Sequence, residues 1–177
     1  MDRRQLLVAA ACGAAAAARA QAPLGDAAAA EAKASPLPAV GAPLVLAPIE
    51  RLDSTRFDPR SADGRVLVVY WWASWCPFCA ETTPQMDALW RAQAPLGSKG
   101  LLLLALSIDN DPKPARDYLA RRGYTLPAAW VTPAFARAVP KPRGLPVTVV
   151  RGRDGRVLQA EAGQLFPEDV QALARHL

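Results

Sequence analysis

Two cysteines separated by two residues, Cys76 and Cys79, are the most reactive side chains in this sequence of 177 residues. They follow an apolar run, in the stretch WWASWCPFC, and precede a pattern typical of a helix. A cysteine at a helix N-terminus meets unpaired backbone N–H groups and the positive end of the helix dipole, which both stabilise a thiolate. Such a thiolate attacks a disulfide, and a nearby second thiol resolves the mixed disulfide. We therefore predict a redox pair in which Cys76 is the nucleophile and Cys79 the resolving thiol.

A metal site and a structural disulfide are the alternatives for this pair. Zinc requires three or four protein ligands, but the third cysteine is Cys12, in the N-terminal segment, and the one histidine is His176. We therefore expect no metal. A disulfide that closes so short a loop removes little entropy from the unfolded chain, so a purely structural bond is disfavoured. Exchange through the Cys76–Cys79 disulfide needs no organic cofactor.

The cysteines lie where a buried strand becomes a helix. Val66–Trp72 is apolar on both faces, which indicates a central strand covered by helices on both sides. Apolar residues at helical spacing after Cys79 predict a helix over about 77–93. Pro77 suits the first turn, where a backbone N–H would have no helical partner.

The remaining elements alternate between strands and helices. We expect a first strand at Leu44–Ile49, a buried strand at Gly100–Asp109, a helix at Pro114–Arg122 capped by Gly123, an edge strand within Tyr124–Val131, a β-hairpin turning at Asp154-Gly155, and a closing helix at Glu168–Leu177. This order predicts one α/β domain over residues 44–177, with a central mixed sheet flanked by helices and an N-terminal strand extension.

The first 43 residues have the composition of an export signal and a linker. Arg3 and Arg4, followed by a short alanine-rich apolar stretch, predict a signal peptide over 1–22. The paired arginines fit a twin-arginine signal as well as an ordinary one. Residues 23–43 are rich in Ala and Pro and predict a disordered linker. We expect a periplasmic protein; lipidation of Cys12 or retention of the signal would anchor it to the membrane instead, but loss of Cys12 with the signal is favoured.

The net charge of +5 is not concentrated in one region. Residues 1–20 contain three arginines and one aspartate, so removal of the signal leaves +3. The remaining Lys and Arg are scattered among acidic residues, which favours a solvated surface over a polyanion-binding patch. We expect no nucleic-acid partner.

The motif WCPFC after a hydrophobic strand, with GLPVTVV about seventy residues later, resembles the thioredoxin superfamily. Within it, the chain is most similar to the exported TlpA/ResA-like thiol-disulfide oxidoreductases. The resemblance covers residues 44–177 and implies a thioredoxin fold, with Cys76 exposed, Cys79 more buried and Pro146 a cis-proline beside them. It also implies that the backbone of Leu145 pairs with an extended substrate polypeptide and that Trp75 contacts the substrate.

The chain departs from this family at the residues that handle protons. Many members carry a glutamate six residues after the first cysteine, where this chain has Thr82, and thioredoxins carry an aspartate six residues before it, where this chain has Tyr70. Glu81 lies one residue too early and fits a solvated acid near the positive end of the helix dipole, which leaves water as the other candidate acceptor. Phe78 cannot donate a hydrogen bond to a thiolate, so with Pro77 stiffening the turn we expect a weakly oxidising pair.

We therefore predict a monomeric periplasmic disulfide reductase that acts on protein disulfides and is recharged by a membrane electron donor of the thiol-reducing type. The resemblance makes cytochrome c maturation, in which apocytochrome cysteines are reduced before haem attachment, a typical task. One alternative is a thiol peroxidase of the related redoxin class, which the close spacing of the cysteines disfavours. Another is a copper-site assembly factor, for which additional His or Met ligands are lacking.

Overall fold

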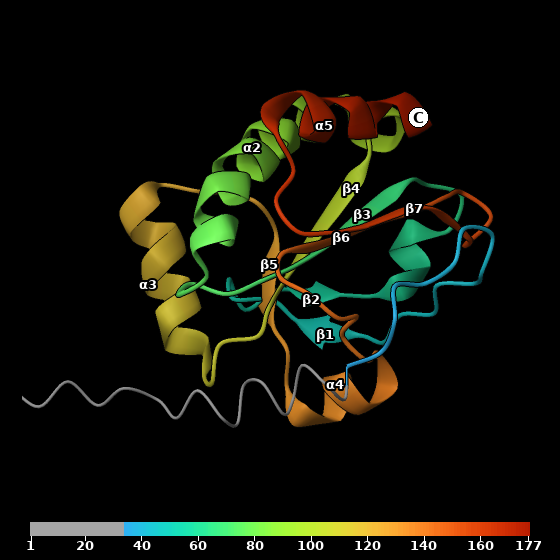
Figure 1. Cartoon of the computed structure of the whole chain (residues 1–177). Helices are drawn as coiled ribbons and strands as arrows, with labels where there is room; N and C mark the ends of the chain where they lie inside the picture. The colour runs from blue at the N-terminus through green and yellow to red at the C-terminus, as the bar shows by residue number, and fades with distance from the viewer. Residues whose placement is uncertain (1–33) are drawn as a thin grey trace, which may run out of the picture.

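A mixed five-stranded sheet forms the centre of the protein (Figure 1). The computed structural model describes residues 34–177. The strand order is β5-β4-β3-β6-β7; β3, β4 and β5 are parallel, whereas β6 is antiparallel to both β3 and β7. The strands are β3 (Leu67–Trp72), β4 (Leu102–Ser107), β5 (Ala128–Trp130), β6 (Val147–Arg151) and β7 (Val157–Ala162). The predicted α/β architecture with a central mixed sheet is confirmed.

The middle strand, β3, is buried along its whole length, as its continuous hydrophobicity predicts. Successive side chains point to opposite faces of a strand, so β3 contributes to both halves of the core. Val68, Tyr70 and Trp72 belong to one cluster, and Leu67, Val69 and Trp71 to the other. Trp71 and Trp72 are therefore core residues, as expected for a strand that is apolar on both faces.

Helices cover both faces of the sheet. The cluster that contains Tyr70 packs against α2 (Pro77–Gln93), α3 (Pro112–Arg122) and α5 (Pro167–Ala172). The opposite cluster packs against α4 (Pro133–Ala138) and a separate small sheet of β1 (Ile49–Glu50) and β2 (Arg56–Phe57). Figure 1 shows α2 and α5 above the sheet and α4 below it. Short 3-10 turns complete the chain: η1 (Pro59–Ala62), η2 (Ala94–Lys99) and η3 (Leu173–His176).

The bounds of α2 agree with the sequence prediction, and those of α3 differ by two residues at the start. α3 begins at Pro112 because the Asp111 carboxylate accepts a hydrogen bond from the Lys113 backbone N–H and caps the helix. It ends at Gly123, which has φ 64° in the left-handed region, as the predicted glycine cap requires. The predicted closing helix is divided between α5 and η3.

The N-terminal region differs from the prediction. The linker predicted over residues 23–43 falls within the described residues at 34–43, where Gly41 N–H donates to Val157 O (2.8 Å) and Val157 N–H donates to Ala42 O (2.9 Å). These bonds satisfy backbone groups at the start of β7, so the ordered domain begins before residue 44. The strand predicted at Leu44–Ile49 overlaps β1 (Ile49–Glu50) only at Ile49. The signal peptide, the twin-arginine motif and Cys12 lie outside the described residues.

The α4 helix was not predicted from the sequence. Thr132 Oγ1 accepts a hydrogen bond from Phe135 N–H (3.1 Å), and Pro133 occupies the first turn. This Thr-Pro pair is a helix-start signal, but a helix of six residues is too short to show a periodic apolar pattern. Phe135 is its one buried side chain.

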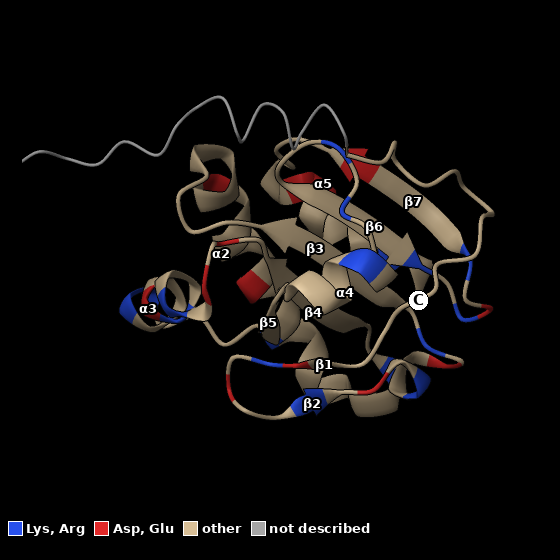
Figure 2. Cartoon of the chain, turned by 90° about the horizontal axis from the view of Figure 1, so that it is seen from below, with Lys and Arg blue, Asp and Glu red and all other residues tan. Residues whose placement is uncertain are grey.

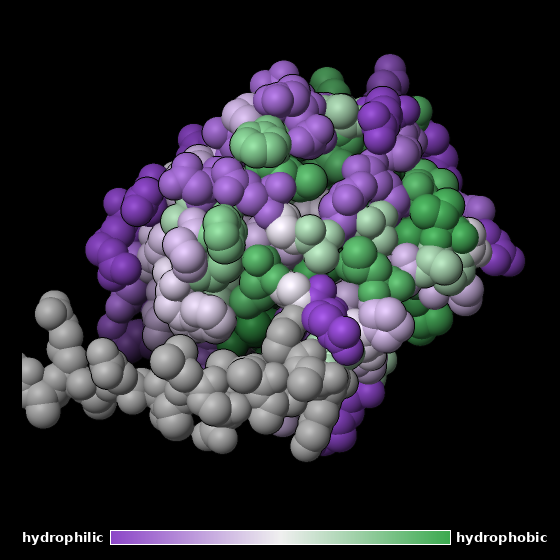
Figure 3. Space-filling view, in the orientation of Figure 1, coloured by the Kyte–Doolittle hydropathy of each residue, from purple (hydrophilic) through white to green (hydrophobic). Residues whose placement is uncertain are grey.

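The surface of the described domain is chemically mixed. Figure 2 shows basic and acidic residues interleaved along α3, where Lys113 Nζ and the Asp117 carboxylate lie 2.6 Å apart. Figure 3 shows hydrophobic residues interspersed with hydrophilic ones on one face. No helix within residues 34–177 is long and apolar enough to cross a membrane, and no three His, Cys, Asp or Glu side chains of this region gather to hold a metal ion.

Candidate active site

Cys76 is the residue that caps the N-terminus of α2. Its extended backbone (φ −82°, ψ 117°) ends the loop that follows β3, and its Sγ accepts a hydrogen bond from Cys79 N–H at 3.2 Å. Pro77 occupies the first helical position, as predicted, and Ala80 N–H donates to Cys76 O (3.0 Å) to begin the helical ladder. The sulfur thus lies at the positive end of the 17-residue helix.

The surroundings of the two thiols shift their pKa values in opposite directions. A hydrogen bond from the Cys79 thiol, opposed by burial and assisted by the backbone N–H groups of Cys79 and Phe78, lowers the pKa of Cys76 to about 7. The same thiol–thiol hydrogen bond, together with burial, raises the pKa of Cys79 well above its ordinary value. The first cysteine is therefore partly ionised near neutral pH while the second keeps its proton.

Cys76 is less accessible than the family resemblance implies. Cys76 is 4% exposed and Cys79 1% exposed, so Cys79 is the more buried of the two, but Cys76 is not an exposed thiol. The reason is that Cys76 packs in the same core cluster as Trp72. The flanking aromatic side chains are accessible instead, with Trp75 62% and Phe78 57% exposed.

The peptide bond between Leu145 and Pro146 is cis, as the resemblance implies. Trp71 pairs with Val147 in the β3–β6 register, so Pro146 continues opposite Trp72, at the end of β3 that leads to the cysteines. Pro146 is buried and its carbonyl accepts from Gly163 N–H at 2.8 Å. Leu145 is half-buried, and within residues 34–177 its backbone N–H and C=O make no hydrogen bond, so both remain available to an added strand.

A buried carboxylate holds the loop that precedes Cys76, and sequence reasoning missed it. Asp109 is 4% exposed and accepts hydrogen bonds from Ser74 N–H (3.2 Å), Ser74 Oγ (2.6 Å) and Ser107 Oγ (2.7 Å). The Trp130 indole N–H donates to Asp109 O at 2.7 Å. Asp109 follows the parallel strand β4, and the carboxyl ends of parallel strands are where functional side chains gather; that position was the available signal.

The two positions that carry acids in relatives are occupied by buried hydroxyl groups. Tyr70 and Thr82 are both 0% exposed. Thr82 Oγ1 donates to Phe78 O at 3.1 Å, a bond within its own helix. Tyr70 instead reaches the turn of α2 that carries Cys79. Glu81 is exposed, as expected for a solvated acid.

Comparison with known proteins agrees with this geometry. The family model described as Redoxin matches residues 32–176. This chain belongs to the Redoxin family. Membership of this family and a thiol pair at the start of α2 place the chain among the thiol–disulfide oxidoreductases of the thioredoxin superfamily.

Solved structures confirm the thioredoxin-like fold. A thiol:disulfide interchange protein of the thioredoxin family from Chlorobium tepidum TLS is 21% identical, with a TM-score of 0.67, over 78% of this chain and 97% of the other. StoA from Bacillus subtilis is 16% identical, with a TM-score of 0.60, over 74% of this chain and 98% of the other. A secreted Mycobacterium tuberculosis disulfide oxidoreductase, homologous to E. coli DsbE, is 18% identical, with a TM-score of 0.60, over 74% of this chain and 96% of the other.

Proposed function

We propose that this protein is an exported disulfide reductase that transfers two electrons from its cysteine pair to disulfides of other proteins. The observation that carries the proposal is the asymmetry of the two thiols. Cys76, with a pKa of about 7, caps a helix and supplies a thiolate at neutral pH, whereas Cys79 keeps its proton until it is needed. This is the division between an attacking and a resolving thiol.

The reaction proceeds in two exchanges. The Cys76 thiolate attacks one sulfur of the substrate disulfide, and the other substrate sulfur leaves as a thiolate and takes up a proton. Cys79 then loses its proton and attacks Cys76 Sγ, which forms the Cys76–Cys79 disulfide and releases the second substrate thiol. The cysteine pair is oxidised by two electrons and the substrate disulfide is reduced by two, so the cycle needs neither a metal nor an organic cofactor.

The contacts of the reduced pair support the reductase direction. A strongly oxidising pair has a reduced form held by several favourable contacts to its thiolate. Here Cys76 receives backbone and thiol hydrogen bonds, but the apolar Phe78 side chain offers none. A pKa of about 7 is close to that of thioredoxin and far above that of DsbA, about 3.5. A reductase requires a donor that returns electrons to the pair, for which we propose a membrane protein of the thiol-reducing type.

The surface beside the cysteines suits an extended polypeptide. The unpaired backbone groups of Leu145 offer a short edge for strand addition. Trp75 and Phe78 provide exposed aromatic area on the cysteine side, where apolar residues of an unfolded client can pack. Proteins with cysteines that must be reduced outside the cytoplasm, such as an apocytochrome c, are suitable substrates, and the protein works as a monomer in the periplasm.

Two cysteine variants test the proposed mechanism. In a turbidity assay of insulin disulfide reduction, Cys76→Ser is expected to lose activity because no nucleophile remains. Cys79→Ser is expected to accumulate mixed disulfides with cell-envelope proteins, which non-reducing electrophoresis detects and mass spectrometry identifies. Activity retained by Cys76→Ser would contradict the mechanism.

Three further measurements test the direction and the alternatives. Equilibration with a thiol buffer gives the reduction potential of the pair, and a value near that of strong oxidants, about −120 mV, would contradict the reductase direction. Rapid consumption of peroxide by the reduced protein would support a thiol peroxidase instead. Stoichiometric copper binding would support an assembly factor.

A further inference from the structure

The resolving step requires Cys79 to lose a proton in a place that water reaches poorly. Cys79 is 1% exposed, and burial disfavours its thiolate. In the reduced protein the adjacent Cys76 sulfur raises the pKa of Cys79 further, but this contribution ends once Cys76 is bound in a mixed disulfide and carries no charge. The remaining obstacle is the free energy needed to place the negatively charged Cys79 sulfur in the protein core.

The Tyr70 hydroxyl lies next to Cys79. Tyr70 is 0% exposed on β3, and its Oη lies 3.4 Å from Cys79 O and 3.0 Å from Thr83 Oγ1. Thr83 Oγ1 donates its single proton to Cys79 O at 2.7 Å, so Tyr70 is the donor in its bond with Thr83. The Tyr70 hydroxyl also interacts with the Cys79 side chain itself. One phenol proton is therefore held within reach of the resolving sulfur.

A second buried phenol completes this group. Tyr118 on α3 is 7% exposed, its ring lies 5.4 Å from that of Trp72, and its hydroxyl oxygen has no hydrogen-bond partner within residues 34–177. An unpartnered buried hydroxyl calls for an explanation. Thr83 and Cys79 are both close enough to affect the pKa of Tyr118. The Tyr118 hydroxyl therefore lies near Thr83 and Cys79 with its proton uncommitted.

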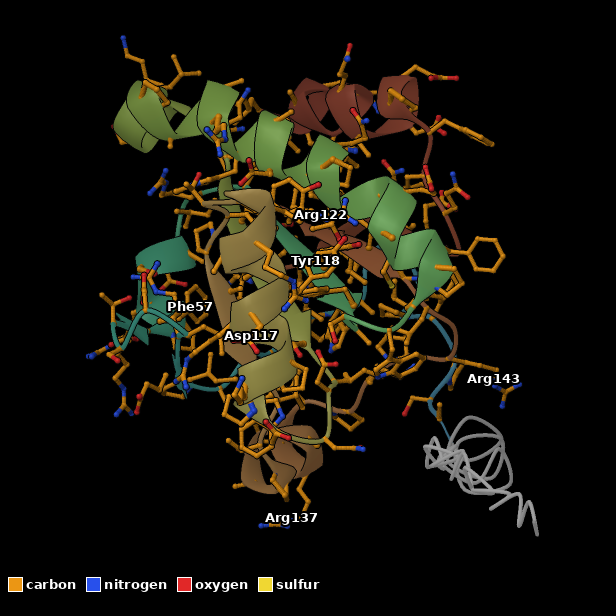
Figure 4. The ribbon with its side chains drawn as sticks, turned by 90° about the vertical axis from the view of Figure 1, so that its left-hand side faces the viewer. Phe57, Asp117, Tyr118, Arg122, Arg137 and Arg143 are labelled. Carbon is orange, nitrogen blue, oxygen red and sulfur yellow. The ribbon has the colours of Figure 1, made fainter. Side chains whose placement is uncertain are left out.

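The charged side chains on the elements around Cys79 are exposed or already in contact with other residues. On α2, Glu81 is exposed; after β4, the Asp109 carboxylate is engaged by Ser74 and Ser107. On α3, the Arg122 guanidinium lies over the Tyr118 ring, 5.4 Å from its centre, and Figure 4 shows these two side chains side by side. The groups that most affect Cys79 are Cys76, then the backbone of Ala73, and then the Tyr70 hydroxyl, which is the one side chain that lowers its pKa; none of them is a carboxylate.

We propose that the Tyr70 hydroxyl donates a hydrogen bond to Cys79 Sγ as this sulfur ionises, and that it thereby stabilises the thiolate from the position at which thioredoxins carry a buried aspartate. Tyr70 does not act as a base, because burial raises its own pKa well above the ordinary value and keeps it protonated. As Tyr70 turns from Thr83 to the sulfur, the Tyr118 hydroxyl takes the vacated position on Thr83 Oγ1. This inference rests on the proposed function, since it concerns the second exchange.

The atoms of this step balance without a new reactant. A bond forms between Cys79 Sγ and Cys76 Sγ while the bond between Cys76 Sγ and the substrate sulfur breaks, and that sulfur receives the electron pair. The proton lost by Cys79 passes to water, and the released substrate thiolate takes up a proton from water, so no proton is gained or lost overall. Tyr70 keeps its proton throughout, and its hydrogen bond lowers only the free energy of the Cys79 thiolate.

Reaction of the reduced protein with the aromatic disulfide DTNB separates the two exchanges. The first coloured thiolate is released when Cys76 attacks, and the second when Cys79 resolves the mixed disulfide, so stopped-flow absorbance records two phases. A hydrogen bond to a charged acceptor is worth about 1.5 kcal/mol, which is about tenfold in an equilibrium constant. Tyr70→Phe is therefore expected to raise the pH midpoint of the second phase by about one unit and to slow it about tenfold at pH 7. The first phase should keep its wild-type rate, which also reports an intact fold.

Tyr124→Phe is the matched control. This change also removes a phenol hydroxyl, from a tyrosine that packs at the edge of the same cluster and whose ring neighbours that of Tyr118. The second phase of Tyr124→Phe should match that of the wild type. An unchanged second phase in Tyr70→Phe would overturn the inference. So would a uniform slowing at every pH, because a merely structural role would not move the midpoint. Failure of the proposed function looks different, since the wild-type protein itself would then lack one of the two phases.

Discussion

Asp109 is expected to fix the loop before the cysteines, and exchange of its carboxylate for an amide tests this role. The carboxylate accepts from Ser74 and Ser107 and is almost fully buried. An amide replaces one acceptor oxygen with an NH2 group that faces these donors. The lost hydrogen bond to a charged group costs about 2 kcal/mol of unfolding free energy. With an m-value of roughly 2 kcal/mol/M, the urea midpoint of Asp109→Asn should fall by about 1 M.

Asp111→Asn provides the control for this measurement. Asp111 is two residues away, it caps α3 through Lys113 N–H, and its replacement removes the same negative charge. Asparagine caps a helix about as well as aspartate, so the unfolding free energy should change by less than about 0.5 kcal/mol. Hydrogen exchange gives a local readout: the Ser74 amide should exchange faster in Asp109→Asn and at its wild-type rate in Asp111→Asn. Equal urea midpoints for the two variants would refute the assignment of Asp109 as the residue that holds this loop.

Three further predictions concern the thiol, the surface and the packing of α2. The rate of Cys76 alkylation by iodoacetamide should be half-maximal at about pH 7, because only the thiolate reacts. Cys79→Ala lacks the thiol hydrogen bond that is the largest cause of the lowered pKa of Cys76, so its midpoint should move upward. An unmoved midpoint would show that this hydrogen bond does not lower the pKa. Trp75→Ala should raise the KM for a polypeptide disulfide while changing the unfolding free energy by less than about 0.5 kcal/mol, because the side chain is 62% exposed; an unchanged KM would remove Trp75 from the substrate surface. Asp87→Ala should lower the unfolding free energy by about 2–3 kcal/mol in urea titration, because the buried Leu126 N–H loses its acceptor at 2.9 Å; a loss below 0.5 kcal/mol would show that water replaces the carboxylate.

The elements that carry the cysteines could be predicted because their signals are local and strong. β3 is a continuous apolar run, and α2 combines a proline in its first turn with apolar residues at helical spacing. Both signals depend on neighbours in the sequence alone. The same holds for Gly123, whose left-handed conformation ends α3.

The features that could not be predicted depend on partners far away in the sequence. In the sequence, Asp109 is only the last residue of a predicted strand, and its role depends on Ser74, which the fold brings against it from 35 positions away. Residues 41–43 have a composition typical of a linker, but Gly41 and Ala42 are ordered because their backbone groups pair with Val157 at the start of β7. The low exposure of Cys76 results from packing of the whole cluster around Trp72, which a motif of four residues does not specify.

The hydroxyl groups near Cys79 follow from two periodicities that meet at the active site. Side chains two apart on a strand share a face, so Tyr70 points to the same side as Trp72, towards α2. Residues four apart on a helix share a face, so Thr83, and not Thr82, lies beneath Cys79 and meets Tyr70. The position six before the first cysteine therefore directs the buried Tyr70 hydroxyl to the turn of α2 that carries Cys79 and Thr83. A phenol there, unlike a carboxylate, stays neutral across the working pH range, so we expect the two thiols to be the groups that govern the pH dependence of exchange.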